Sequence, residues 1–332
     1  MPTPNRLSEL IASFRGKRLV VFGDLIADEY VYGRVARVSR EAPVLILEYD
    51  ATEIVPGGAG NAANNVASLG ATVTLVSLVG RDEPGRRLFK VLPRGVERSG
   101  LARPGGYRTP VKTRILAGGI HSAKQQVVRI DRFTGEPVTD AHREAAEQMA
   151  RKAVKGADAV LVSDYGSGLV TPKFVHELAG LIKKGTPILI DSRYALTKYR
   201  GLTACTPNES EVEQVLGVTI DDKAQVLERA GRALLTRTRM QAVLVTRGSR
   251  GMALFEAGKK TVHIPIFGSD QIADVTGAGD TVMATMTLAL ASGASFEEAA
   301  RLANFAGGLV VMKRGTATVS AAELRRAVGA GL

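Results

Sequence analysis

Short runs of β-branched and aliphatic residues recur along the chain, and longer segments with helical spacing separate several of them. This alternation is typical of a mostly parallel sheet that helices cover on both faces. We therefore expect an α/β fold with the sheet as its central layer. The predicted strands are 18–22, 72–80, 158–164, 187–191 and 242–248, and the predicted helices include 141–155, 172–184 and 222–239.

Two stretches, at about 30–55 and 107–131, depart from this alternation. They contain VLILEY, VKTRILA and QQVVRID, in which polar and apolar residues alternate as they do in half-exposed strands. We interpret them as a small sheet inserted between core elements, which is the arrangement of a lid. No low-complexity linker divides the 332 residues, so we expect a single domain over 1–332.

The composition disfavours several classes of protein. The N-terminal segment lacks the apolar core of a signal peptide, and no run approaches the roughly 18 apolar residues of a membrane helix. Cys205 is the only cysteine, which excludes an internal disulfide and a cysteine-rich metal site. We expect a cytoplasmic protein with no membrane partner.

Basic residues exceed acidic residues, with 44 Lys and Arg against 33 Asp and Glu. The excess is concentrated between Arg81 and Arg114, which contains ten basic and three acidic residues. Such charge fits a solvated basic face, nucleic acid, an anionic membrane surface or a phosphorylated small molecule. Because this stretch has few aromatic residues, the chain has no Trp, and no helix-turn-helix or zinc pattern occurs, we do not expect nucleic acid as a partner.

Two glycine-rich segments are candidate ligand loops, since ligands of open parallel sheets bind beyond the carboxyl ends of the strands. PGGAGNAANNVASLGA (56–71) opens a helix after a strand, with glycines that allow close approach and Asn61 that can bond a hydroxyl. DVTGAGDTVMA (274–284) opens a second helix, whose first amides would form a site for anions. Asp280 is there either a helix cap or a base held beside a phosphate. Neither segment matches G-x-G-x-x-G or the P-loop pattern.

Together with GDLIAD, TPNESE and TRGSRG, these segments resemble the ribokinase (PfkB) family of sugar kinases in order and spacing over essentially the whole chain. GDLIADEYVYG, VSREAPV, SDYGSG and the pair KTR and QQVVRID resemble more closely the D-glycero-β-D-manno-heptose 7-phosphate kinases of lipopolysaccharide precursor synthesis. The resemblance implies a ribokinase-like three-layer α/β/α fold with a β-sheet lid. It also implies ATP-dependent phosphorylation of the anomeric hydroxyl, giving the 1,7-bisphosphate. The nucleotidyltransferase domain often fused in this branch is absent from the sequence, so we expect a stand-alone kinase.

The resemblance assigns roles to individual residues. Asp280 would be the base that accepts the sugar hydroxyl proton, beside an anion hole formed by the amides of Gly277, Ala278 and Gly279. Asp28, at the end of the first strand, would hold sugar hydroxyls, although the residue alone fits a turn equally well. The other candidate acceptor contacts are Gly57, Gly58, Asn61 and, for a remote phosphate, Lys112, Arg114, Gln125, Arg129 and Arg193, each of which is otherwise an ordinary surface residue.

The nucleotide site would involve TPNESE, where the resemblance places an N-x-x-E element near the triphosphate. Asn208 and Glu211 would bind Mg²⁺ through water, since Mg²⁺ needs few protein carboxylates. Alternatively, this element is an ordinary helix start after Pro207. The expected ATP contacts are Asn208, Glu209, Ser210, Glu211, Thr246, Gly248 and Asn304, the last of which is otherwise a packing residue, and Asp274 with the carbonyls near Gly315 would hold K⁺.

Three departures weaken the substrate assignment. Ser167 replaces the usual lysine of S-D-Y-x-K-G, Arg40 replaces a proline in SREAP, and Asp191, Ser192 and Arg193 replace D-P-K. A lost cation near the sugar would weaken phosphate binding by on the order of 1.5–3 kcal/mol unless Arg40 or Arg193 compensates.

Two other functions therefore stay open. One is a PfkB-type kinase for another sugar or sugar phosphate. The other is a non-catalytic sugar or nucleotide sensor or nucleic-acid binder, against which the presence of Asp280 argues, because a sensor needs no base. Since exposed lid strands commonly pair with those of a partner, we also expect a homodimer.

Overall fold

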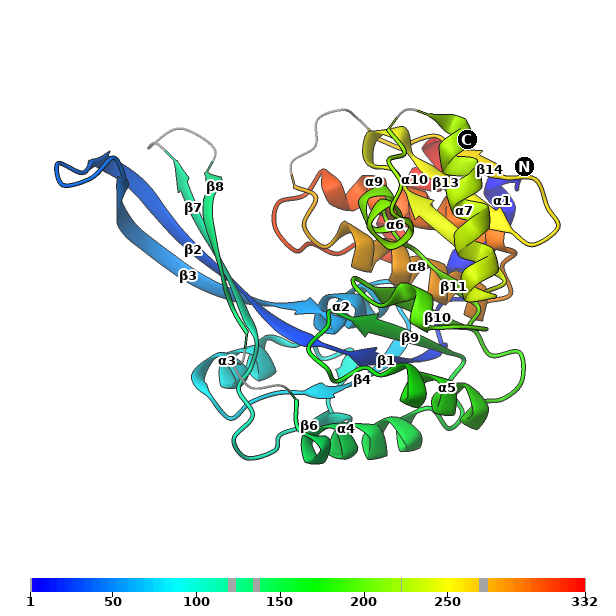
Figure 1. Cartoon of the computed structure of the whole chain (residues 1–332), viewed down its shortest axis with the longest axis horizontal. Helices are drawn as coiled ribbons and strands as arrows, with labels where there is room; N and C mark the ends of the chain where they lie inside the picture. Colours follow the sequence, from blue (N-terminus) through cyan, green and yellow to red (C-terminus); the bar gives the residue numbers. More distant parts are fainter. Residues whose placement is uncertain (1, 119–123, 134–137, 222, 269–273, 332) are drawn as a thin grey trace.

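The computed structural model describes residues 2–118, 124–133, 138–221, 223–268 and 274–331. In these ranges a central ten-stranded sheet lies between two layers of helices, and a four-stranded sheet projects from one end of it (Figure 1). The predicted α/β class and the small separate sheet are both confirmed. No helix in the described part of the chain is both long enough and apolar enough to cross a membrane.

The central sheet has the order β14-β13-β12-β11-β10-β9-β1-β4-β5, with β6 also paired to β4. Neighbouring strands are parallel except at one edge, where β12, β13 and β14 are antiparallel. The strands are β1 (Arg18–Gly23), β4 (Thr72–Leu78), β5 (Val96–Glu97), β6 (Leu101–Ala102), β9 (Ala159–Asp164), β10 (Ile188–Ser192), β11 (Ala204–Cys205), β12 (Ala242–Thr246), β13 (Met252–Glu256) and β14 (Val262–Ile264).

Both faces of this sheet are apolar. Successive side chains of a strand point to opposite sides, and these strands carry apolar residues at consecutive positions. In β1, Leu19 and Val21 join one core cluster, whereas Val20 and Phe22 join the other. The first cluster lies under α1 (Pro4–Ala12), α2 (Ala59–Ser68), α8 (Ala278–Ala291), α9 (Phe296–Val311) and α10 (Ala321–Ala330), and the second lies under α4 (Asp140–Ala153), α5 (Pro172–Leu181), α6 (Glu209–Leu216) and α7 (Ala224–Thr238).

The small sheet has the order β3-β2-β7-β8, and we refer to it as the lid. Its strands are β2 (Leu25–Val38), β3 (Leu45–Gly58), β7 (Val111–Gly118) and β8 (Gln125–Arg132), and α3 (Glu83–Val91) packs against β3. β2 begins only one residue after β1 ends, so the lid starts earlier in the sequence than predicted. Asp28 consequently lies inside β2, and its predicted position at the end of the first strand was wrong.

Helix starts differ in whether a side chain caps their first amides. α6, α9 and α10 begin with capping boxes, in which a side chain at the start and a glutamate three residues later bond the free amides. α2 and α8 instead begin at Gly58 and Gly277, which have φ values of 56° and 78° and provide no capping side chain. Because α2 and α8 pack against each other, their uncapped starts lie on the same side of the sheet.

Candidate active site

The carboxyl ends of β1 and β9 meet the uncapped starts of α2 and α8 beside the root of the lid. Parallel strands end at the same edge of a sheet, so residues far apart in the sequence converge there. Asn61 of α2, Tyr165 after β9 and Asp280 of α8 are joined by hydrogen bonds at this edge.

Asp280 is buried in the first turn of α8 with 5% of its surface exposed. Its Oδ2 accepts a hydrogen bond of 2.8 Å from Asn61 Nδ2, and its Oδ1 accepts one of 3.2 Å from the Tyr165 hydroxyl. Burial raises the pKa of Asp280 to about 6, although both hydrogen bonds act in the opposite direction. A carboxylate with such a pKa is ionised at pH 7 and is a better proton acceptor than an ordinary aspartate.

The start of α8 provides unpaired amides beside this carboxylate. The amide of Ala278 donates to the Val275 carbonyl at 3.3 Å, so its predicted place in the anion hole is not supported. The amides of Gly277, Gly279 and Asp280 have no acceptor among the residues that the structure describes. Since the Asp280 side chain caps no amide of the helix, the interpretation of Asp280 as a helix cap was wrong.

Two features require glycine at position 277, namely its backbone conformation and its close neighbours. Its φ of 78° is one that residues with a side chain rarely adopt. A Cβ at Gly277 would lie 2.5 Å from Asn61 Nδ2, the atom that bonds Asp280. The glycine therefore allows α2 and α8 to approach closely enough for that bond.

The root of the lid holds a buried ion pair. Arg114 of β7 donates to Asp28 Oδ1 at 2.7 Å, and both side chains are about nine-tenths buried. A Cβ at Gly57 would lie 2.4 Å from Asp28 Oδ2, so glycine is needed there as well. Asp28, which was predicted to hold the acceptor, thus lies beside Gly57 and Arg114, which were predicted to contact the acceptor as well.

Lys112 and Arg114 face the same side of the lid as Asp28, because β2 and β7 pair in register. Burial lowers the pKa of Lys112, while the nearby Asp28 raises it. Arg129 is opposite Arg114 in β8, but it is exposed and pairs with Asp131 at 2.9 Å. Its contribution to an acceptor site is therefore not supported by a contact.

A cavity of about 850 Å³ lies between the lid and the loop around Gly315. Gln125 lines it, together with Arg114 and Arg314. The loop is linked to the lid by the hydroxyls of Tyr30 and Thr316, which are 2.8 Å apart.

The predicted nucleotide residues are largely engaged with one another. Asn208 and Glu211 form the capping box of α6, which matches the alternative interpretation as a helix start. Glu209 pairs with Arg247 at 2.7 Å and also with Arg250, whereas Ser210 is exposed.

The other three predicted nucleotide residues lie on separate elements. Thr246 forms a bridge to Asn208, and Gly248 is exposed just after β12. Asn304 is buried in α9 and donates to the Pro265 carbonyl at 2.9 Å, as a packing residue would.

Asp191 was missed as a site residue, although it directly precedes the end of β10. Burial raises its pKa well above the ordinary range, and the charges of Glu211 and Asp280 add to this effect. Asp191 is thus close enough to both the candidate base and the candidate magnesium residue for their charges to act on it. No cluster of three or more potential metal ligands occurs in the described ranges.

Asp274 lies where the resemblance places a monovalent cation. Its Oδ1 accepts the Thr276 amide at 2.9 Å and its Oδ2 accepts the Gly315 amide at 3.0 Å. The carboxylate therefore connects the segment before α8 to the loop after α9. This contact brings together the two segments that were predicted to share an ion.

The three departures in sequence have different structural settings. The Ser167 hydroxyl donates to the buried Asp24, whose carboxylate also accepts the amides of Tyr165 and Ser167. Arg40 belongs to the turn between β2 and β3, at the far end of the projecting hairpin, so it does not compensate within its own chain (Figure 1). Arg193 is close enough to affect the pKa values of Lys112, Asp191 and Glu211.

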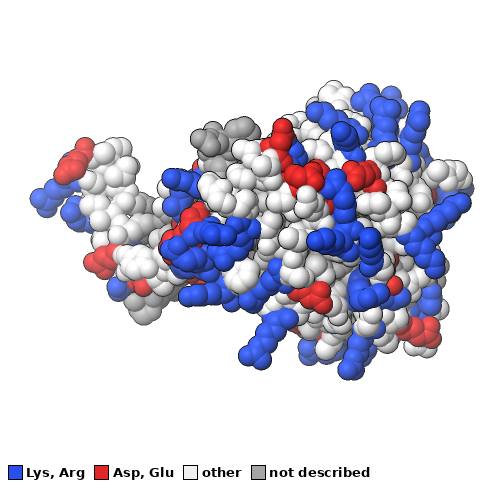
Figure 2. Space-filling view, turned by 90° about the horizontal axis from the view of Figure 1, so that it is seen from below, with Lys and Arg blue, Asp and Glu red and all other residues white. Residues whose placement is uncertain are grey.

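Basic residues are spread over the face shown in Figure 2 and are interspersed with acidic ones. Several arginines of the basic stretch have structural contacts. Arg98 and Arg103 both lie over the ring of Phe89, at 5.2 and 5.1 Å from its centroid. Arg86 and Arg87 donate to backbone carbonyls. These contacts favour the interpretation as a solvated structural face.

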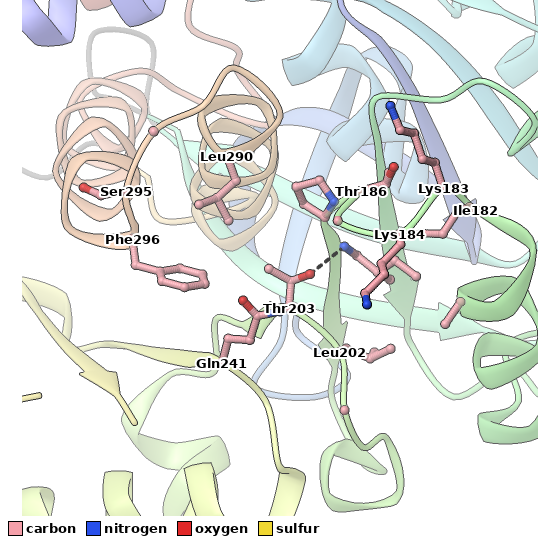
Figure 3. A pocket seen from close by; sticks show the side chains of 16 residues that line it. Ile182, Lys183, Lys184, Thr186, Leu202, Thr203, Gln241, Leu290, Ser295 and Phe296 are labelled. Atoms are coloured by element: carbon pink, nitrogen blue, oxygen red, sulfur yellow. Dashed lines mark hydrogen bonds between the residues drawn. The ribbon is translucent and has the colours of Figure 1, made fainter. Parts of the chain in front are cut away.

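A pocket of about 470 Å³ lies at the opposite edge of the sheet, where β10 and β11 begin. Figure 3 shows Lys183 and Lys184 at its rim, with Leu290 and Phe296 on the other side. None of the predicted site residues lines this pocket, so we do not assign the active site to it.

Known proteins are similar to this chain over most of its length. The model of the pfkB family of carbohydrate kinases matches residues 17–323. "Bifunctional protein HldE" of Trichlorobacter lovleyi is 41% identical over 94% of this chain and 62% of its own, and that of Geobacter metallireducens is 40% identical over 97% and 65%. This chain thus spans less than two thirds of the length of these relatives.

The solved structures support the fold. Arabidopsis thaliana ribokinase complexed with ribose and ATP superposes with a TM-score of 0.71 at 22% identity, covering 94% of this chain and 98% of its own. Escherichia coli phosphofructokinase-2 in complex with fructose-6-phosphate gives a TM-score of 0.73 at 18% identity, covering 95% and 98%. The predicted ribokinase-like fold is confirmed.

Proposed function

The chain belongs to the pfkB family of carbohydrate kinases, and we propose that it transfers the γ-phosphoryl group of ATP to the anomeric hydroxyl of D-glycero-β-D-manno-heptose 7-phosphate. The products would be ADP and the 1,7-bisphosphate. The observation that carries this proposal is the buried Asp280 carboxylate, held by Asn61 beside the uncapped amides of α8.

In this reaction Asp280 accepts the proton of the acceptor hydroxyl. The hydroxyl oxygen bonds to the γ-phosphorus of ATP while the bond between that phosphorus and ADP breaks. The amides of Gly277, Gly279 and Asp280 stabilise the negative charge on the transferring group. Asp28 and Asn61 orient the acceptor hydroxyls, and Gly57 leaves room for the Asp28 carboxylate. Positioning and electrostatic stabilisation account for most of the catalysis in phosphoryl transfer, which suits a site with a single base.

The acceptor assignment is supported by the relatives named HldE and by the motifs shared with heptose kinases. Lys112, Arg114 and Arg193 supply positive charge at the root of the lid for a remote phosphate. A second candidate is a kinase for another sugar or sugar phosphate, because Ser167 provides no charge and its hydroxyl bonds Asp24.

Two cations belong to the proposal. Mg²⁺ would neutralise charge on the phosphates of ATP and would be held through water by Glu211 and Asn208, near the carboxyl group of Asp191. Their side chains fit this role only in part, because each already accepts one capping bond from the backbone amide of the other residue. K⁺ would lie beside Asp274 and the loop at Gly315, which joins the segment before α8.

We also propose that the protein acts in the cytoplasm as a homodimer formed through the lid. The lid exposes large apolar side chains, including Val38, Val128 and Ile130, which are 47–59% exposed. Unpaired strands with such residues are stabilised by covering them. Sedimentation of the parent and of the double variant Val128→Asp, Ile130→Asp tests this, and a parent that sediments as a monomer contradicts it.

The reaction is tested by measuring ADP release with a panel of acceptors. The panel contains the heptose 7-phosphate, the unphosphorylated heptose, ribose and fructose 6-phosphate, all at one salt concentration. Removal of the remote phosphate should lower kcat/KM by on the order of 10²–10³, because remote binding energy orients the reacting hydroxyl. A preference for an unphosphorylated sugar overturns the heptose 7-phosphate assignment and leaves the kinase assignment in place.

A further inference from the structure

Tyr165 lies between the candidate base and the lid, and neither the sequence motifs nor the reaction above assigns it a role. Its hydroxyl donates to Asp280 Oδ1 at 3.2 Å, while Asn61 donates to Oδ2 at 2.8 Å. Each oxygen of the carboxylate therefore has one donor, and each retains a lone pair for another hydrogen bond. Two donors on opposite oxygens fix the plane of the carboxylate.

The ring of Tyr165 is itself held from several sides. The Nζ of Lys112, on lid strand β7, lies 4.6 Å from the ring centroid, which is a favourable cation–π distance. The Tyr165 amide donates to Asp24 Oδ2 at 2.8 Å. A Cβ at Gly58 would lie 3.4 Å from Tyr165 Cε2, which is van der Waals distance, so the start of α2 lies directly beside the ring.

We propose that Tyr165 is a positioning residue that holds the Asp280 carboxylate in the orientation needed to accept the acceptor's proton, and that Lys112 of the lid keeps the ring in place. This inference rests on the proposed role of Asp280 as the base. It links the lid to the base through one aromatic side chain. The order of contacts is lid ammonium, aromatic ring, hydroxyl and carboxylate.

The charged and titratable groups that face Asp280 come from every neighbouring element. They are Asp28 on β2, Lys112 on β7, Tyr165 after β9 and Asp191 on β10. The Tyr165 hydroxyl stabilises the ionised carboxylate and lowers its pKa, and Lys112 acts in the same direction. Replacing the hydroxyl by hydrogen therefore raises the pKa of Asp280, while the ring and its contact with Lys112 remain.

The test compares Tyr165→Phe with the parent. The phenyl ring should leave ADP affinity unchanged, lower kcat by about 10–100-fold as expected for a lost hydrogen bond to a charged group, and move the acid limb of kcat/KM to higher pH. Tyr199→Phe is the matched control, since it removes another buried tyrosine–aspartate bond, of 2.7 Å to Asp164, that does not involve Asp280. Its acid limb should coincide with that of the parent.

The outcomes separate this inference from the proposed function. If Asp280→Asn retains the turnover of the parent, the base itself is wrong and the proposed mechanism fails. If Asp280→Asn is inactive but Tyr165→Phe has the acid limb of the parent, Tyr165 serves only packing and the inference is overturned. A rise in the acid limb of Tyr165→Phe with unchanged ADP affinity supports it.

Discussion

The side-chain amide of Asn61 donates to the Asp280 carboxylate at 2.8 Å, and this bond joins the starts of α2 and α8 across 219 positions of sequence. Neither helix start has a capping side chain, so amides and carboxylate are left to act on a ligand. The bond depends on a glycine at position 277, because a Cβ there would lie 2.5 Å from the Asn61 nitrogen.

We expect Gly277→Ala to lower both stability and activity. A positive φ costs a residue with a side chain about 1–2 kcal/mol, and the clash with Asn61 adds to this. Gly279→Ala is the matched control for stability, because nothing lies within 4 Å of a Cβ there and alanine favours a helix. Thermal unfolding should show a lower midpoint for Gly277→Ala alone, and equal midpoints would contradict the argument.

Asp280→Asn should lower kcat by about 10²–10⁴, because it keeps the shape of the side chain and removes its basicity. Calorimetric titration with ADP should give the affinity of the parent. Asp140→Asn changes an exposed carboxylate on α4 and should have the parent's rate. Turnover of Asp280→Asn within threefold of the parent, where chemistry limits the rate, would show that Asp280 is not the base.

The pH dependence of activity and that of stability should run in opposite directions. Activity needs ionised Asp280, so kcat/KM should fall as the pH drops below about 6, the value to which burial raises its pKa. Stability behaves otherwise, because a folded-state pKa above the usual 3.8 means that protonation favours the folded chain. The unfolding midpoint of Asp280→Asn minus that of the parent should shrink between pH 7 and pH 5, and a constant difference would refute the raised pKa.

Potassium should stimulate the reaction. An ion beside Asp274 would order the loop that the Gly315 amide anchors to it, and with it the segment that leads into the amides of α8. Initial rates are compared in K⁺, Na⁺ and tetramethylammonium buffers, with Asp274→Ala as a variant that should lose the difference. Equal rates of the parent in all three buffers would contradict stimulation by potassium.

The sequence predicts the layers of this fold well because the strands are buried on both faces and separated by long helices. It predicts less well where one strand serves two environments. β2 runs from the buried edge of the central sheet into the exposed lid, so Leu25, Ile26 and Ala27 show no alternation and the strand start was missed.

Site residues were predicted where a motif brings glycine and a carboxylate together, as at Asp280. Tyr165 and Asp191 were missed because their proximity to Asp280 arises from strand order and not from local sequence. The available signal was their place at the ends of predicted strands. The place of Ala278 in the anion hole is not supported by its amide, which bonds Val275, and a motif does not show which amides of a helix start are already bonded.

Asp24 is the single residue between the central sheet and the first lid strand, and it is bonded in every direction. Its amide donates to Ser163, its carbonyl accepts from Ala59, and its carboxylate accepts from Tyr165 and Ser167. Because these hydrogen bonds fix both the backbone and the side chain of Asp24, we expect the root of the lid to be stiff. Bending is expected farther out, where the pairing of β2 with β3 shifts register after Tyr32. The far half of the lid is therefore expected to move relative to the central sheet, while the residues that we propose hold the acceptor stay fixed at its root.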